Sequence, residues 1–203
     1  MKKFLSLFCS FFALSFTSPL IAEEINDPAT GISFPLEVSF EENGQSYTLE
    51  ATGVATRKKL FAKVYSIAHY MQNPIQGSPD TVIAEVLDND SIAKQLTMHW
   101  VRKVSPQKIQ SAYESALETT LTPNERAAMQ DEIDTFIGFF QSNSEVGDVY
   151  IFRWLPEGKL IIEINEKRAG EINNPAFARA VWEIWLGSNR VVKRNNLVSL
   201  YTQ

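Results

Sequence analysis

The alternation of apolar and polar residues predicts strands, then two helices, then strands, then helices. The segment 53–71 reads GVATRKKLFAKVYSIAHYM, has no proline, and from Lys59 onward its β-branched and aromatic residues predict one long strand. One face of that strand carries Leu60, Ala62, Val64, Ser66, Ala68 and Tyr70, and the other carries Phe61, Lys63, Tyr65, Ile67, His69 and Met71. The first face is mostly small, so helices are expected to pack on it. A helix is the alternative, because a short apolar run is ambiguous by period alone.

Shorter strands are predicted on both sides of this segment. The dipeptide Asn43-Gly44 is a strong hairpin signal. Polar turns at residues 88–90 and 156–158 each join two further predicted strands. The remaining predicted strands are Ile32–Phe40, Tyr47–Ala51, Thr81–Leu87, Gln95–Arg102, Val149–Leu155, Lys159–Asn165 and Lys167–Ile172.

Helices are predicted where a capping residue precedes an apolar stripe. Ser105-Pro106 starts the first, Thr122 and Glu125 form a capping box for a second that runs to Phe140, and Asn174-Pro175 starts a third. A last helix is expected over Val191–Leu200. This order of elements predicts an α+β domain with an antiparallel sheet covered on one face by helices.

The first 22 residues have the layout of a secretory signal peptide. Two lysines precede an apolar run over residues 4–16, and Ala22 marks the expected cleavage site. A retained anchor is the alternative, although the run is short for a membrane span. The only cysteine, Cys9, lies in this leader, so residues 23–203 are expected to form one cysteine-free domain in the periplasm.

Charge and side-chain content argue against several functional classes. Without the leader the chain has 17 Lys and Arg against 24 Asp and Glu, a formal net charge of about −7. No nucleic-acid partner is expected, because such a partner needs a concentrated basic surface. Two histidines without repeated ligand spacing predict no metal site. The sequence also lacks the common hydrolase, phosphate-loop and zinc-protease motifs, so no cofactor and no catalytic residue is predicted.

Three segments in this order resemble the chalcone isomerase-like family, and its bacterial secreted branch in particular. They are the strand ending KVYSIAHYM, the helical pair after it, and the run GKLIIEINEKRAGEINNPAFARAVWEIWLGSN. The resemblance spans roughly residues 30–200. It implies an open-faced β-sandwich, a large curved antiparallel sheet with a layer of helices. It also implies that the small-residue face of the long strand lies under helices and the other face beside a cleft.

Enzymes of this family close a flavanone ring by adding a phenolate oxygen across an enone, which needs a cation and hydroxyl donors. The positions that supply those groups correspond here to Ala55, Tyr65, Ser105, Ala112 and, more loosely, residues 193–195. Arg57 is the nearest cation to the arginine position, two residues further along the same face. Since most of the reactive groups are replaced, a non-catalytic relative is expected.

Four residues are predicted to contact a ligand in the cleft: Arg57, Lys63, Tyr65 and His69. Arg57 or Lys63 would pair with a carboxylate at the mouth. A solvated basic turn is the alternative for Arg57, and a half-buried structural pair for Tyr65 and His69.

The resemblance to non-catalytic plant relatives implies a small apolar or amphipathic ligand such as a fatty acid. One alternative is an intramolecular lyase, an isomerase that acts on an enone-like substrate through Arg57 and Tyr65. The other is an envelope interaction protein without a ligand. The oligomeric state stays open, and no stable membrane span is expected after signal cleavage.

Overall fold

The computed structural model describes residues 23–203, so the predicted signal peptide and Cys9 lie outside the described residues. A seven-stranded antiparallel sheet runs in the order β3-β4-β5-β6-β7-β8-β9. Its strands are β3 (Glu37–Glu42), β4 (Gln45–Lys59), β5 (Ala62–Met71), β6 (Lys94–Trp100), β7 (Val149–Leu155), β8 (Lys159–Ile164) and β9 (Lys167–Asn173). A separate pair consists of β1 (Glu24–Asn26) and β2 (Ser33–Pro35).

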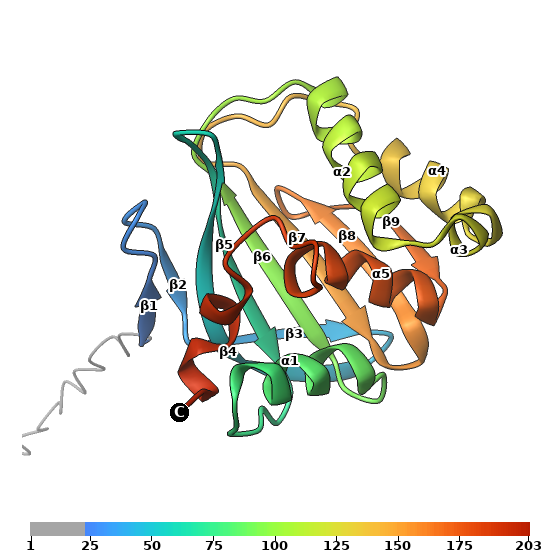
Figure 1. The fold of residues 1–203 in the computed structure, drawn as a ribbon. Helices are drawn as coiled ribbons and strands as arrows, with labels where there is room; N and C mark the ends of the chain where they lie inside the picture. The colour runs from blue at the N-terminus through green and yellow to red at the C-terminus, as the bar shows by residue number, and fades with distance from the viewer. Residues whose placement is uncertain (1–22) are drawn as a thin grey trace, which may run out of the picture.

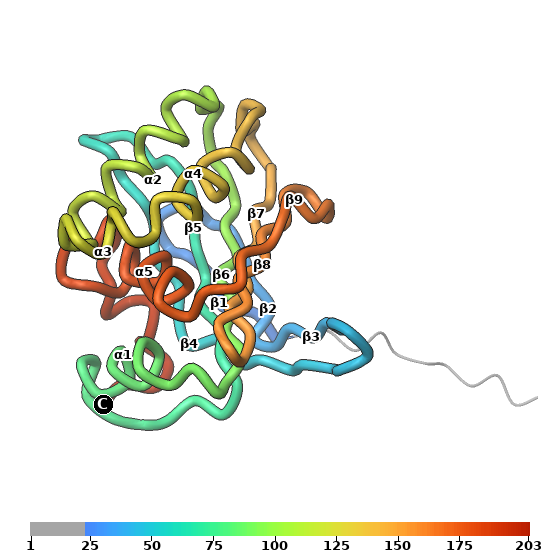
Figure 2. The backbone as a smooth tube through the Cα atoms, turned by 90° about the vertical axis from the view of Figure 1, so that its right-hand side faces the viewer, coloured from blue at the N-terminus to red at the C-terminus, as the bar shows by residue number. Residues whose placement is uncertain are grey.

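Helices cover one face of this sheet, whose strands curve around them (Figure 1). They are α1 (Pro79–Asp88), α2 (Pro106–Thr120), α3 (Pro123–Ala128), α4 (Gln130–Gly138) and α5 (Pro175–Leu186), with 3₁₀ segments η1 (Pro156–Gly158) and η2 (Arg194–Tyr201). In the side view the helical layer and the β1–β2 pair lie on opposite sides of the sheet (Figure 2). The predicted α+β class, with a curved antiparallel sheet and a helical layer, is confirmed.

The predicted helix starts coincide with real ones. The Thr122 side chain accepts from the Glu125 amide, while the Glu125 carboxylate accepts from the Thr122 amide, so both bonds of the capping box are present. The Asn174 side chain caps α5 by accepting from the Phe177 amide. The helix predicted from 122 to 140 is divided at Met129, which leaves the helical conformation. The last predicted helix is the 3₁₀ segment η2 instead.

The prediction of a strand over Thr81–Leu87 is wrong, because these residues belong to α1. Ser78 caps this helix by accepting from the Thr81 amide, and a proline follows it at the first helical position. The buried side chains of Val82, Ile83 and Val86 form one helical face. Ser78-Pro79 is the same kind of start signal that predicts α2. The β-branched residues that follow this pair led to the strand prediction instead.

Residues 53–71 form the two strands of a hairpin, whereas one long strand from Lys59 onward was expected. β4 continues through Gly53 to Lys59, which pairs with Ala62, so β5 starts three residues later than predicted. Leu60 makes the turn with a positive φ of 55°. Bulges interrupt the β4–β5 register between Ala51 and Gly53 and again between Arg57 and Lys58.

The helices pack on the opposite face of β5 from the one predicted. Tyr65, Ile67 and Met71 belong to the core beneath the helices, together with the α5 tryptophans. Ala68 and Tyr70, from the small-residue face, pack in a second core on the β1–β2 side. That face is covered by the N-terminal strands, which the sequence pattern did not predict as a layer.

Candidate functional site

The candidate site is a cleft of about 690 Å³ between the turn of the β4–β5 hairpin, the end of β6 and the first half of α2. Pockets that hold small molecules have volumes in this range. The lining residues are Arg57, Lys59, Leu60, Phe61, Ala62, Val64, Tyr65, Trp100, Arg102, Lys103, Val104, Ser105, Lys108, Ile109, Ala112, Tyr113, Ala116, Ile184 and Val191.

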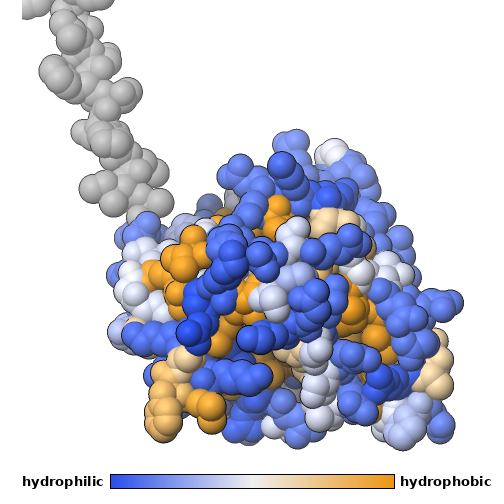
Figure 3. All heavy atoms as spheres, turned by 90° about the horizontal axis from the view of Figure 1, so that it is seen from above, coloured by the Kyte–Doolittle hydropathy of each residue, from blue (hydrophilic) through white to orange (hydrophobic). Residues whose placement is uncertain are grey.

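The charge of this lining has one sign. Among the described residues that line the cleft, five are lysine or arginine and none is aspartate or glutamate. Four of the five cations are exposed, whereas the buried lining residues are apolar or phenolic: Tyr65, Trp100, Ile109, Tyr113 and Ile184. The cleft therefore has an apolar floor and a cationic rim. Viewed from this end, apolar atoms show between hydrophilic side chains (Figure 3).

Arg57 is the most enclosed cation of the cleft. It lies on β4 directly opposite Tyr65 on β5, and its side chain is half-buried. The Nη1 atom donates to the Val191 carbonyl at 2.6 Å, which fixes the guanidinium against the segment that follows α5. The remaining N–H groups of the guanidinium supply donors for a second acceptor.

Tyr65 contributes a buried hydroxyl to the same wall. Its oxygen accepts from the Trp185 indole N–H at 3.0 Å. Burial raises the pKa of Tyr65 to about 12, against the opposing effects of this hydrogen bond and of the Arg57 charge. The hydroxyl is therefore protonated at neutral pH and keeps its own proton to donate.

Several lining residues were not singled out from the sequence. Arg102, Lys103 and Lys108 come from the β6–α2 connection and the first turn of α2, and their only sequence signal was a cluster of basic residues. Ser105 and Ala112, the two helix positions named from the resemblance, do line the cleft.

Lys63 does not lie with Tyr65. The bulge beyond Arg57 leaves Val64 without a β4 partner, so Lys63 and Tyr65 no longer share a face. The Lys63 ammonium donates to the Ala29 carbonyl, outside the cleft.

His69 is also outside the cleft, buried under η2. Thr52 Oγ1 lies 2.7 Å from its Nδ1 and donates to the Leu197 carbonyl at 2.6 Å, so the imidazole is the donor to Thr52. Burial lowers the pKa of His69 to about 3, with a further contribution from the Lys94 charge, and the ring is neutral at physiological pH. These hydrogen bonds link β5 to β4 and η2.

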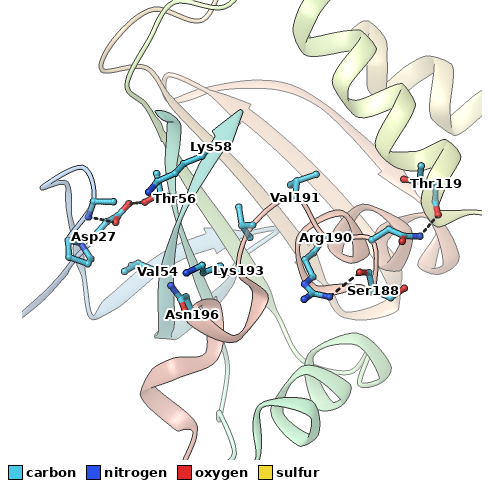
Figure 4. Close-up of a pocket in the computed structure, with 14 residues that line it drawn as sticks. Asp27, Val54, Thr56, Lys58, Thr119, Ser188, Arg190, Val191, Lys193 and Asn196 are labelled. Atoms are coloured by element: carbon cyan, nitrogen blue, oxygen red, sulfur yellow. Dashed lines mark hydrogen bonds between the residues drawn. The ribbon is translucent and has the colours of Figure 1, made fainter. Parts of the chain in front are cut away.

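A second hollow, of about 960 Å³, lies between β4, residues 27–29 and the segment 188–196 (Figure 4). Burial raises the pKa of Asp27, but hydrogen bonds from Ser66, Thr56 and the Ala29 amide outweigh it and leave the pKa below its usual value. Other polar groups here also bind protein atoms: Arg190 donates to the Ser188 carbonyl at 3.1 Å. This lining carries three cations, Lys58, Arg190 and Lys193, beside the Asp27 carboxylate, so its charge is mixed, whereas the charged residues of the cleft lining are all cations.

Within residues 23–203, no cluster of three or more His, Cys, Asp or Glu side chains is arranged to hold a metal ion. None of the helices in this part of the chain combines the length and the apolar character that crossing a bilayer requires.

Comparison with known proteins identified one family and similar solved structures. Residues 28–195 match the family described as chalcone isomerase-like. The structure is similar to that of a fatty-acid binding protein of Arabidopsis thaliana, with a TM-score of 0.69 and 15% identity over 88% of this chain and 99% of that one. No curated protein sequence matches the chain. At this identity the structural likeness shows the fold alone.

Proposed function

The chain belongs to the chalcone isomerase-like family, and we propose that it is a non-catalytic member that binds a small amphipathic anion, with a fatty acid as the leading candidate. The observation that carries the proposal is the lining of the cleft: five cations and no carboxylate, around an apolar floor. The name of the similar Arabidopsis protein supports this choice of ligand.

Each part of such a ligand has a counterpart in the cleft. A carboxylate is recognised by a guanidinium through charge-assisted hydrogen bonds, and Arg57 is the least exposed cation of the lining. The protonated Tyr65 hydroxyl adds a neutral donor. An alkyl chain that packs against the floor residues Ile109, Tyr113 and Ile184 would itself leave water, which is favourable in proportion to its apolar area removed from water.

The proposed location is the periplasm, on the basis of the leader-like residues 1–22. Fractionation of the native host tests this, with the mature N-terminus read by mass spectrometry. Recovery of the uncleaved chain from the cytoplasm would contradict it.

The ligand is tested in two steps. Native mass spectrometry of protein from its own host should show an added mass released by denaturation, and thermal-shift measurements should show stabilisation by C8–C18 acids that exceeds stabilisation by the matched alcohols. An empty cleft after gentle purification, together with no shift from any acid of the series, would refute the proposal.

A second candidate function is an intramolecular lyase for an enone-like substrate. The observation in its favour is that Arg57 and Tyr65 face one another across β4 and β5 and line the same cleft. It requires turnover of a chalcone or related enone that is lost on Arg57→Ala while the circular dichroism spectrum is unchanged. Absence of turnover across an enone panel would remove this candidate.

A further inference from the structure

The most exposed apolar side chains of the described residues gather at one end of the molecule. Leu60 is 90% exposed, Phe61 is fully exposed, and Val146 is 72% exposed. Two further large apolar side chains of residues 23–203, Ile75 and Leu200, are only 37% and 43% exposed.

Backbone contacts hold Val146 at this end. Its loop is tied to the β6–α2 connection through paired hydrogen bonds between Val104 and Ser144 and through the Gly147 amide, which donates to the Trp100 carbonyl at 2.9 Å. The β6–α2 connection in turn lines the cleft together with Leu60 and Phe61. The turn and both loops lie at the top of Figure 1.

Folding does not explain the residues at this turn. Leu60 has a positive φ, which a two-residue hairpin turn normally assigns to Asn, Asp or Gly. Neither Leu60 nor Phe61 buries apolar surface in return. Two apolar side chains therefore project into solvent at a position where a polar turn would fold at least as well.

Basic residues surround the apolar tip although the chain as a whole is acidic, with a formal net charge of −5. Lys58, Lys59 and Lys63 flank the turn, and Arg102, Lys103 and Lys108 lie on the adjoining rim. Glu145, beside Val146 in the neighbouring loop, is paired with Lys103. The charge of this end is thus opposite in sign to that of the rest of the protein.

We propose that this end docks on the surface of an anionic phospholipid bilayer, with Leu60 and Phe61 inserted between headgroups and the surrounding cations near the lipid phosphates. Exposed apolar side chains within a basic surface favour such an interface, because insertion and attraction to anionic lipid act together. The charge complementarity selects anionic lipid over neutral lipid.

The docking geometry would bring the cleft to the membrane. Leu60 and Phe61 line the cleft as well as forming the tip, so an inserted tip places the cleft mouth at the headgroup level. The inference adds a membrane partner to the proposed ligand binding. It rests on the proposed function only for the biological reason to dock, since bilayer binding does not require a ligand in the cleft.

The test is flotation of the protein with phosphatidylcholine vesicles, with and without phosphatidylglycerol. Wild type should bind vesicles that contain phosphatidylglycerol and lose binding as salt rises from about 0.1 M to about 1 M, because salt screens surface charge. The double variant Leu60→Ser/Phe61→Ser should bind at least tenfold more weakly, with an unchanged melting temperature because both side chains are exposed. The matched control Leu200→Ser, on η2 away from this end, should bind like wild type. All proteins share one N-terminus, so any effect of residues 1–22 is common to them.

No binding to anionic vesicles, equal binding to neutral vesicles, or undiminished binding of the double variant would each overturn the inference. Failure of this inference and failure of the proposed function are distinguishable. Acid binding without vesicle binding would leave the ligand proposal intact, and vesicle binding without acid binding would leave the docking surface intact.

Discussion

Replacing Arg57 with methionine tests how much the charge of its side chain contributes to ligand binding, with little change in the shape of the cleft. Methionine keeps an unbranched apolar stem but removes the guanidinium that we propose pairs with the ligand carboxylate. A matched control is Lys63→Met, which removes the same formal charge from the neighbouring strand, where the ammonium contacts the Ala29 carbonyl outside the cleft.

The expected effect follows from the environment of Arg57. A hydrogen bond between charged groups contributes about 1.5–3 kcal/mol, or about 10- to 150-fold in affinity. Because Arg57 is only half-buried, solvent screening favours the lower end, and we expect an acid to bind about tenfold more weakly. A fatty alcohol of the same chain length has no carboxylate and should lose much less.

Displacement of a fluorescent fatty acid measures both affinities, for wild type, Arg57→Met and Lys63→Met. Loss of the hydrogen bond to Val191 should also lower the free energy of unfolding by about 1 kcal/mol, so protein is kept below its melting temperature throughout. Equal losses for acid and alcohol would show that the substitution acts through shape, and undiminished acid binding would place the carboxylate elsewhere.

Three further predictions concern stability. Tyr65→Phe should lower the free energy of unfolding in urea by about 1–3 kcal/mol, because it leaves the buried Trp185 indole N–H without its acceptor. Tyr70→Phe is the control and should change it little, since the Tyr70 hydroxyl has no partner among the described residues. The free energy of unfolding should fall as pH drops from about 6.5 towards 3: the folded-state pKa of His69 is about 3, so the unfolded state binds the proton first. The slope should approach about 1.4 kcal/mol per pH unit, and a flat urea midpoint over this range would contradict it. Gly53→Ala should lower the melting temperature by several degrees, because the added Cβ would clash with the Asn196 carbonyl oxygen and displace η2. An unchanged melting temperature would show that η2 can move at little energetic cost.

Local signals predicted most of the elements well. Serine, threonine or asparagine before proline marked the starts of α2, α3 and α5. Thr122 and Asn174 accept from an unpaired amide of the first turn, whereas Ser105 makes no capping hydrogen bond, and at all three starts the proline presets φ. The same signal at Ser78 was outweighed by the β-branched residues that follow it, which led to the wrong prediction of a strand over Thr81–Leu87.

The candidate site was harder to predict because it depends on register. Strand alternation alone put Lys63, Tyr65 and His69 on one face, and a bulge at Val64 separates the first two. Alternation also cannot say which face meets the helices, since that depends on where the β1–β2 pair lies. Arg102, Lys103 and Lys108 reach the cleft only through tertiary packing.

One residue borders both hollows of the molecule. Val191 lines both, and its backbone is held by the Arg57 side chain on one side and by the Ile184 carbonyl on the other. The strand β4 also lies between the hollows, because Val54, Thr56 and Lys58 line one of them and Arg57 and Lys59 line the other. The loop after α5 is therefore a wall common to both hollows, and a change in either of its two hydrogen bonds would alter the shape of both.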